Sequence, residues 1–403
     1  MSKIDILREI RELKNYLSYS KNIGFFFGAG TSCALGIPDI AQLTREVETT
    51  LEVETTLKDG AAKTFRIIKD DLKTLIQGRD VNIEDILNHL RTIRELTKES
   101  ETKNYIGVCG KDSATVDGKI CKAIYQIITA SELSTSLTST KRFFAWYNLL
   151  NRDFTKEVFT TNYDLVIEKA LEASEIPYFD GFVGSFEPFF WQESVDHQAQ
   201  HGDLTKNWIR LWKIHGSLSW FRRYSETAKY HRIIRIGNIG NVADIKDELV
   251  IYPSKEKYDS SRKQPFIAYF DRMRDYLLGG ELLFVFTGYS FSDQHINEIV
   301  FNCMRQNNRL FVIVFFYKDA DVENLHKLCS AYLNLHVFGP TKAIINGELG
   351  EWHFNKEAIM PNEITTTYWN EEKSYLTLGD FNALVNFLVA SSGKRDSEER
   401  GAP

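Results

Sequence analysis

The segment that most constrains the fold is an apolar run that ends abruptly in small residues. Ile23–Phe27 contains no charged residue, as in a strand buried on both faces of a parallel sheet. Gly28-Ala29-Gly30-Thr31-Ser32 follows, where the backbone can turn sharply and approach a ligand. The two hydroxyl residues can cap a following helix, whose first amides would face an anion. Strand, glycine turn and helix start together predict a nucleotide-binding site.

The glycine spacing leaves a second interpretation open. Gly36 follows Gly30 by six residues, whereas the dinucleotide fingerprint G-x-G-x-x-G separates the corresponding glycines by three. A tight strand-to-helix turn without a ligand therefore explains this segment as well.

The length and composition of the chain limit the fold and function classes that it can belong to. The 403 residues, 43% of them apolar, suit two to three domains or one large α/β domain with an inserted subdomain. The net charge of −6 argues against extended nucleic-acid binding by this chain alone. The five cysteines form no C-x-x-C pair, so we expect neither a disulfide framework nor a zinc site. With no long apolar span and no signal-peptide core, we expect a cytoplasmic protein.

Periodicity predicts an α/β fold, a Rossmann-like parallel sheet with a helical insertion subdomain. We expect a helix at residues 2–19, helices over most of 40–150, and a loop at 109–119. The expected units are an N-terminal helix at 1–22, the Rossmann-like domain at 23–340 with its insertion at about 41–150, an α/β extension at 341–390, and a disordered tail at 391–403.

Four small polar turns follow predicted strands, at 28–32, 161–164, 215–217 and 288–293. Because ligands of open α/β sheets bind at the carboxyl ends of the strands, we expect these turns to converge. Taken singly, each has an ordinary explanation, since Asn162 and Asp293 could simply cap helices. His197 and His201 have the spacing of a metal pair but lack the glutamate of H-E-x-x-H, so we expect them to be solvated.

These turns resemble, in order, the signature motifs of sirtuins. The resemblance lies in Gly28–Ser32 with Gly36–Asp39, in Thr161–Asp164 and in Ile214–Ser217. Gly288–Asp293 is similar to the later nucleotide-binding motif of the bacterial sirtuin-like branch. The resemblance implies that Asn162 positions the ribose or the attacking water, that Asp164 supports its loop, and that His215 is the catalytic base. It also implies NAD contacts from Gly28, Ala29, Gly30, Thr31, Ser32, Pro38, Asp39, Thr161, Asp164, Gly288, Tyr289, Ser290 and Asp293, with Gly288, Ser290 and Asp293 on the adenosine half.

Departures from the family pattern separate this chain from protein deacylases. Deacylating sirtuins carry a four-cysteine zinc module, which this chain cannot build, and follow G-I-P-D with Phe-Arg where this chain has Ile40-Ala41. The chain looks like zinc-free sirtuin-like effectors of bacterial antiphage defence that destroy NAD. We therefore expect a metal-free NAD glycohydrolase that makes nicotinamide and ADP-ribose. Two alternatives stay open, a protein deacylase or ADP-ribosyltransferase, and a non-enzymatic module that binds an NAD derivative.

An enzyme that destroys NAD needs control, and a chain of this length leaves little room for a fused sensor domain. We expect a homo-oligomer switched by a partner. The resemblance points to a ring-shaped ATPase of the HerA type, with a short Argonaute protein as the second choice. The N-terminal helix and the segment after Gly339 are the candidate contact surfaces, although both could simply cover the sheet.

Overall fold

The protein is described from a computed structural model that covers most of the chain. The described residues are 2–54, 60–98, 100–150, 155–196, 207–225, 229–237, 248–251, 264–329, 331–361 and 363–392. The two histidines considered as a metal pair, and all but the first two residues of the expected tail, lie outside these ranges.

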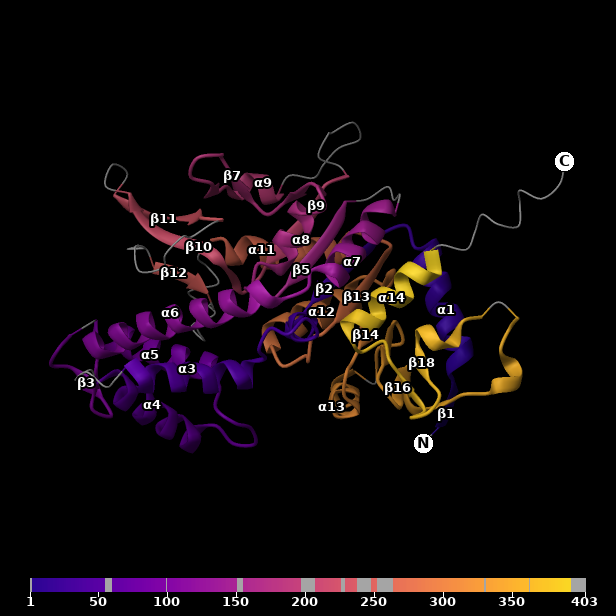
Figure 1. Cartoon of the computed structure of the whole chain (residues 1–403), viewed down its shortest axis with the longest axis horizontal. Helices are drawn as coiled ribbons and strands as arrows, with labels where there is room; N and C mark the ends of the chain where they lie inside the picture. Colours follow the sequence, from indigo (N-terminus) through magenta and orange to yellow (C-terminus); the bar gives the residue numbers. More distant parts are fainter. Residues whose placement is uncertain are drawn as a thin grey trace.

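A large, mostly parallel sheet forms the centre of the molecule (Figure 1). In the described part of the chain it has ten strands, in the order β1-β17-β16-β15-β14-β13-β2-β5-β9-β6. The strands from β15 to β6 are all parallel, which confirms the predicted α/β class. Their bounds are β15 (Leu335–Phe338), β14 (Leu310–Phe315), β13 (Leu282–Thr287), β2 (Ile23–Phe27), β5 (Lys156–Thr160), β9 (Ile209–Lys213) and β6 (Tyr178–Phe179).

The strand order reverses beside β2. From β2 the chain moves to β5 and β9 on one side, then returns to place β13, β14 and β15 on the other. Crevices at such reversals, outside the carboxyl ends of the strands, are where open α/β sheets bind ligands. A ligand is therefore expected at the edge of the sheet where β2 and β13 end.

Helices cover both faces of this sheet. Successive residues of β2 alternate between the two cores, with Phe25 and Phe27 in one and Phe26 in the other. The first core includes α1 (Ile6–Tyr19), α7 (Thr138–Leu149), α8 (Val166–Glu172) and α14 (Phe381–Ser392). The second includes α11 (Phe266–Leu278), α12 (Gln294–Gln306) and α13 (Asp319–Cys329). The sheet is thus buried on both sides, as its apolar strands require.

Between β2 and β5 the chain forms a helical insertion with a hydrophobic core of its own (Figure 1). It contains α3 (Ile40–Glu54), α4 (Ala61–Leu75), α5 (Ile83–Thr97), α6 (Gly110–Ser134) and the short strands β3 (Asn104–Tyr105) and β4 (Val108–Cys109). The next helix, α7, packs instead in the core of the main sheet.

The predicted loop at 109–119 is wrong, because α6 runs unbroken from Gly110. Its polar residues have partners on α5 that sequence alone does not reveal. Ser113 donates a hydrogen bond to the Leu90 carbonyl oxygen, and Asp117 pairs with Arg91 and Arg94. Tertiary contacts therefore override a local preference for turn.

The described residues also form a smaller antiparallel sheet, which the sequence did not predict. Its order is β12 (Glu248–Ile251), β10 (Gly216–Ser225), β11 (Tyr230–Arg235), β8 (Phe189–Phe190) and β7 (Phe182–Val183), and the short helix α9 (Gln192–Asp196) follows β8 in the chain. The strands β7 and β8 have only two residues each, which is too few to show the alternation of a strand.

The two chain ends complete the main sheet. Residues 2–5 form β1 (Ser2–Asp5), paired with β17 (Glu348–His353), so the predicted helix begins four residues late. Beyond Gly339, β16 (Lys342–Ile345) pairs antiparallel with β15, and β17 in turn pairs antiparallel with β16. The apolar side of α1 is buried in the core, so this helix covers the sheet. The remaining elements are η3 (Lys356–Ala358), η4 (Thr365–Thr367), β18 (Trp369–Asn370) and β19 (Tyr375–Leu376).

A buried histidine makes the stability of this fold depend on pH. His336 on β15 is 6% exposed, with Nε2 3.2 Å from Oδ1 of Asn346. Burial lowers its pKa, because the charged imidazolium loses its hydration. The unfolded chain then binds the proton more tightly, so we expect the free energy of unfolding to fall as the pH drops below about 6.5. Urea unfolding at pH 7.5 and 5.5 measures this, and His336→Gln should show a smaller difference. An equal pH dependence in both proteins would contradict the assignment.

Candidate functional site

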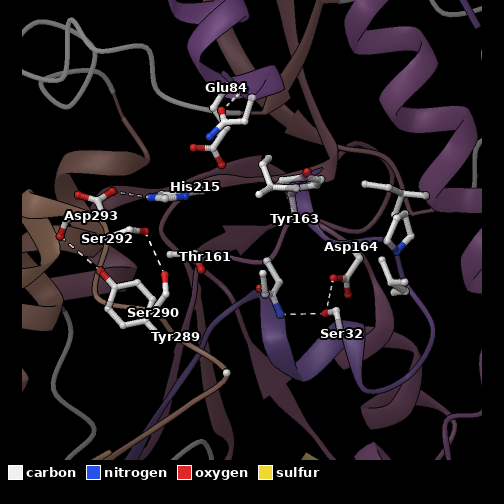
Figure 2. Close-up of a pocket in the computed structure, with 18 of the residues that line it drawn as sticks. Ser32, Glu84, Thr161, Tyr163, Asp164, His215, Tyr289, Ser290, Ser292 and Asp293 are labelled. Atoms are coloured by element: carbon white, nitrogen blue, oxygen red, sulfur yellow. Dashed lines mark hydrogen bonds and ion pairs between the residues drawn. The ribbon is translucent and has the colours of Figure 1, made fainter. Parts of the chain in front are cut away.

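A cavity of about 360 Å³ lies at the carboxyl ends of β2, β5, β9 and β13 (Figure 2). Residues from all four predicted turns line it, so the expected convergence occurs. The predicted site residues in its wall are Ala29, Ser32, Pro38, Thr161, Asn162, Asp164, His215, Gly288, Tyr289, Ser290 and Asp293. Gly28, Gly30, Thr31 and Asp39 lie outside the wall, and the roles of all these residues in binding and catalysis stay predictions.

The glycines hold the turns after β2 and β13 against each other. The Gly28 amide donates to the Thr287 carbonyl oxygen at 3.0 Å, and the Gly30 amide donates to that of Gly288 at 2.8 Å. A Cβ atom on Gly28 would lie 2.4 Å from the Gly288 carbonyl oxygen, and one on Gly288 would lie 2.4 Å from the Thr31 nitrogen. Gly288 also has a φ of 67°. The glycines are needed first for turn-to-turn packing, whereas the sequence suggested that they clear space for a phosphate.

A hydrogen-bonded network fixes the amide of Asn162. Its Nδ2 donates to the Gly28 carbonyl oxygen at 3.1 Å, to Thr31 Oγ1 at 3.0 Å and to Ser32 Oγ at 2.8 Å. Ser32 Oγ in turn donates to Asp164 Oδ2 at 2.6 Å. Among the described residues none donates to the Asn162 carbonyl oxygen, Oδ1. That oxygen is the acceptor that this side chain can offer a ligand.

Asn162 is not the residue that caps α8, whose N-cap position is Leu165. Asp164 Oδ1 accepts the amide of Val166, the first residue of α8, at 3.1 Å. Asp39 similarly accepts the Gln42 amide in the first turn of α3. Asn162 is therefore held in the wall of the cavity by contacts unrelated to helix capping.

His215 and Asp293 form a pair across the ends of β9 and β13. The Nε2 atom of His215 lies 3.2 Å from Asp293 Oδ2, while Asp293 Oδ1 accepts the His295 amide at the start of α12. Tyr289 donates to the Asp293 carbonyl oxygen. Burial and the nearby Asp293 charge raise the pKa of Tyr289 well above its usual value, so it stays a neutral donor. Asp293 thus caps a helix, as the sequence allowed, and also orients a histidine.

The helical insertion supplies the opposite wall, which sequence reasoning missed. Arg79, Asn82, Glu84, Asp85 and Asn88 come from the start of α5 and the segment before it, and Ile128 comes from α6. Figure 2 shows Glu84 on its helix facing the cavity across from the His215–Asp293 pair. The capping box at Asn82 was visible in the sequence as a helix start, but nothing local indicated what the helix would face. Ile37, Ile40, Tyr163 and Ser292 were likewise missed.

Charge in the wall is mostly acidic. Arg79 is held by both oxygens of Asp85, at 2.6 and 2.7 Å, which leaves its charge largely compensated.

Three further features concern the surroundings of the site and the described chain as a whole. Burial raises the pKa of the Cys33 thiol, beside the site, to about 11, so this thiol stays protonated and is a poor nucleophile. The described residues include no group of three or more side chains suited to hold a metal ion. None of the described helices is both long and apolar enough to cross a membrane.

Comparison with known proteins identifies a matching family over part of the chain. Residues 156–337 match the family described as a SIR2-like domain, a range that begins after β2 and its turn. Among solved structures, the chain is similar to a Sir2 homologue–NAD complex, with 15% identity and a TM-score of 0.38, over 78% of this chain and 84% of that one. A mutant Sir2 homologue–ADP ribose complex gives 13% identity and a TM-score of 0.38, over 75% and 83%. No curated protein matches. At these TM-scores the likeness gives no residue a role.

The turn-to-turn contact predicts a large difference between two glycine-to-alanine substitutions. Gly28→Ala should destabilise the protein by about 3 kcal/mol or more, because its methyl group meets backbone atoms that cannot rotate away. Gly118→Ala is the control, since no described atom lies within 4 Å of its Cβ position and alanine favours the helix interior by about 0.5–1 kcal/mol. Urea unfolding measures both. Equal stabilities for the two variants would contradict the packing role of Gly28.

Proposed function

We propose that this chain binds NAD in the cavity and hydrolyses the bond between nicotinamide and ribose. The observation that carries the proposal is the His215–Asp293 pair in one wall with the Asn162 carbonyl oxygen in the same cavity, at the reversal of strand order. The match of residues 156–337 to a SIR2-like domain supports NAD as the ligand. The known complex of a Sir2 homologue with NAD is consistent with that choice.

The residues suit a reaction that needs a base and a positioned water. Nicotinamide leaves as a neutral molecule with the electron pair of the broken bond, so no general acid is required. A water oxygen then bonds to the ribose carbon, and the proton that it loses needs an acceptor. The His215 tautomer with its hydrogen on Nε2 donates to Asp293, which leaves Nδ1 as the basic nitrogen. Asp293 would stabilise the imidazolium that forms, and Asn162 Oδ1 would orient the water or a ribose hydroxyl.

The cavity wall also fits the rest of a dinucleotide. Because the wall is mostly acidic and Arg79 is already paired, neutral groups are the better candidates for the phosphates. In the turn after β13 the Ser290 hydroxyl donates to the Ser292 hydroxyl at 3.1 Å, which leaves the Ser292 hydroxyl hydrogen for an anion. This turn would hold the adenosine half, and the turn after β5 would hold the nicotinamide half.

We further propose that NAD cleavage serves antiphage defence and is switched by a partner. The support is the resemblance to zinc-free sirtuin-like effectors, with a ring ATPase of the HerA type or a short Argonaute protein as the candidate partner. Light scattering, combined with NAD assays before and after addition of the neighbouring gene product, tests this. A monomer that is fully active without any partner would contradict it.

The His215–Asp293 pair predicts graded losses of activity. His215→Ala should lower kcat for nicotinamide release by about a hundredfold to ten-thousandfold, as for loss of a positioned general base. Asp293→Asn should cause a smaller loss, because the imidazole remains but its charged form loses a carboxylate partner. His353→Ala, an exposed histidine on β17, is the control and should leave kcat unchanged. Nicotinamide release by each variant is measured by chromatography. Wild-type turnover by the His215 variant would refute the role of His215 as the general base.

Asn162 is expected to affect both activity and stability. Asn162→Ala should abolish NAD cleavage and also lower the free energy of unfolding by about 1–3 kcal/mol, because Gly28, Thr31 and Ser32 lose their shared donor. Asn162→Asp should be even less stable than Asn162→Ala, because it places a second carboxylate beside Ser32 and Asp164. Unfolding curves and nicotinamide assays on the same preparations measure both effects. An active, fully stable Asn162→Asp variant would be incompatible with the network.

A further inference from the structure

We propose that Glu132 is a positioning residue that couples the helical insertion to the turn bearing Asn162 and Asp164. The catalytic part of this inference rests on the proposed NAD cleavage, whereas the coupling itself is a property of the fold. Glu132 lies in the last turn of α6, and its side chain is 2% exposed. A buried carboxylate at that position needs partners, and it finds them outside the insertion.

Both oxygens of Glu132 are used by the segment that follows Asp164. Oε1 accepts the Leu165 amide at 2.7 Å, and Oε2 pairs with the Lys169 ammonium group one turn further along α8. Leu165 is the residue directly after Asp164 and precedes the first residue of α8. The carboxylate therefore fixes the point where the site turn becomes a helix, in a favourable place for a negative charge.

The main sheet holds the same turn from the other side. The Lys213 ammonium group donates to the Asp164 carbonyl oxygen, the Leu218 amide donates to that of Tyr163, and Ser32 donates to the Asp164 carboxylate. The turn is thus fixed between two bodies, with Glu132 as a hydrogen-bonding attachment from the insertion. Loss of that attachment should free the end of the turn that leads into α8.

Glu132 and the wall residues of α5 belong to the same packed unit of the insertion. Helix α6 has 25 residues and a length of roughly 37 Å, and it packs along α5 in the insertion core. Arg91 on α5 pairs with Asp117 on α6, and Ser113 on α6 bonds to the Leu90 carbonyl oxygen. The same α5 brings Glu84 and Asn88 to the cavity. A displacement of the insertion would therefore change the cavity wall and release the site turn together, which is a route by which a bound partner could control activity.

Hydrogen exchange tests the coupling without reference to any activity. In the full chain, Glu132→Ala should speed amide exchange of residues 162–166 on the order of tenfold, because a buried attachment is lost. Glu363→Ala is the matched control, since it also removes a glutamate with a buried side chain and a basic partner, here Arg11. Neither Glu363 nor Arg11 lines the cavity. This variant should leave exchange at 162–166 unchanged. Unaltered exchange in the Glu132 variant would overturn the inference.

Kinetics test whether the attachment matters for chemistry. Glu132→Ala should lower kcat about tenfold or more, whereas Glu363→Ala should stay close to wild type, because the contacts of Glu363 do not include the cavity wall. Glu132→Gln retains an acceptor for the Leu165 amide, so it should recover most of kcat, and it replaces the alanine variant if that one does not fold. Faster exchange with wild-type kcat would refute the positioning role. A wild-type protein that releases no nicotinamide would refute the proposed function, while the exchange experiment would still decide the coupling.

Discussion

The contact between the backbones of two turns is the constraint on which the rest of the site depends. Gly28 and Gly288 meet where β2 and β13 end, at a distance that excludes any side chain on either residue. This contact places Ala29 and Ser32 on one side of the cavity and the segment from Tyr289 to Asp293 on the other. It also presents the Gly28 carbonyl oxygen to Asn162, which links a third strand end to the first two. The cavity is thus a consequence of how three strand ends pack.

The second wall has a separate origin. The helical insertion has its own core, and it reaches the sheet edge through the start of α5 and the end of α6. A site whose walls come from two separately packed units can open or close when one unit moves against the other. A cavity formed only by the edge of one sheet could not change in this way. Such a division is the physical basis of the proposed control by a bound partner.

Much of the sheet and half of the site could be predicted from the sequence. The strands β2, β13 and β14 are long apolar runs, and the turns after β2, β5, β9 and β13 share one edge because parallel strands must end there. The predictions that failed concern features that depend on contacts between residues far apart in the sequence. Ser113 and Asp117 read as loop residues until their partners on α5 are known, and Glu84 could not be placed opposite His215 from local pattern. The packing of Gly28 against Gly288 could not be predicted either, since a close neighbour after another strand is invisible in the sequence.

The most direct test of the account is a crystal structure of this chain with ADP-ribose bound. We expect the ligand in the cavity between α5 and the ends of β2 and β13, with its terminal ribose near Asn162 and His215 and its adenosine half along Ser290 and Ser292. A ligand bound elsewhere on the protein, or an ADP-ribose whose terminal ribose lies away from His215, would contradict the central claim.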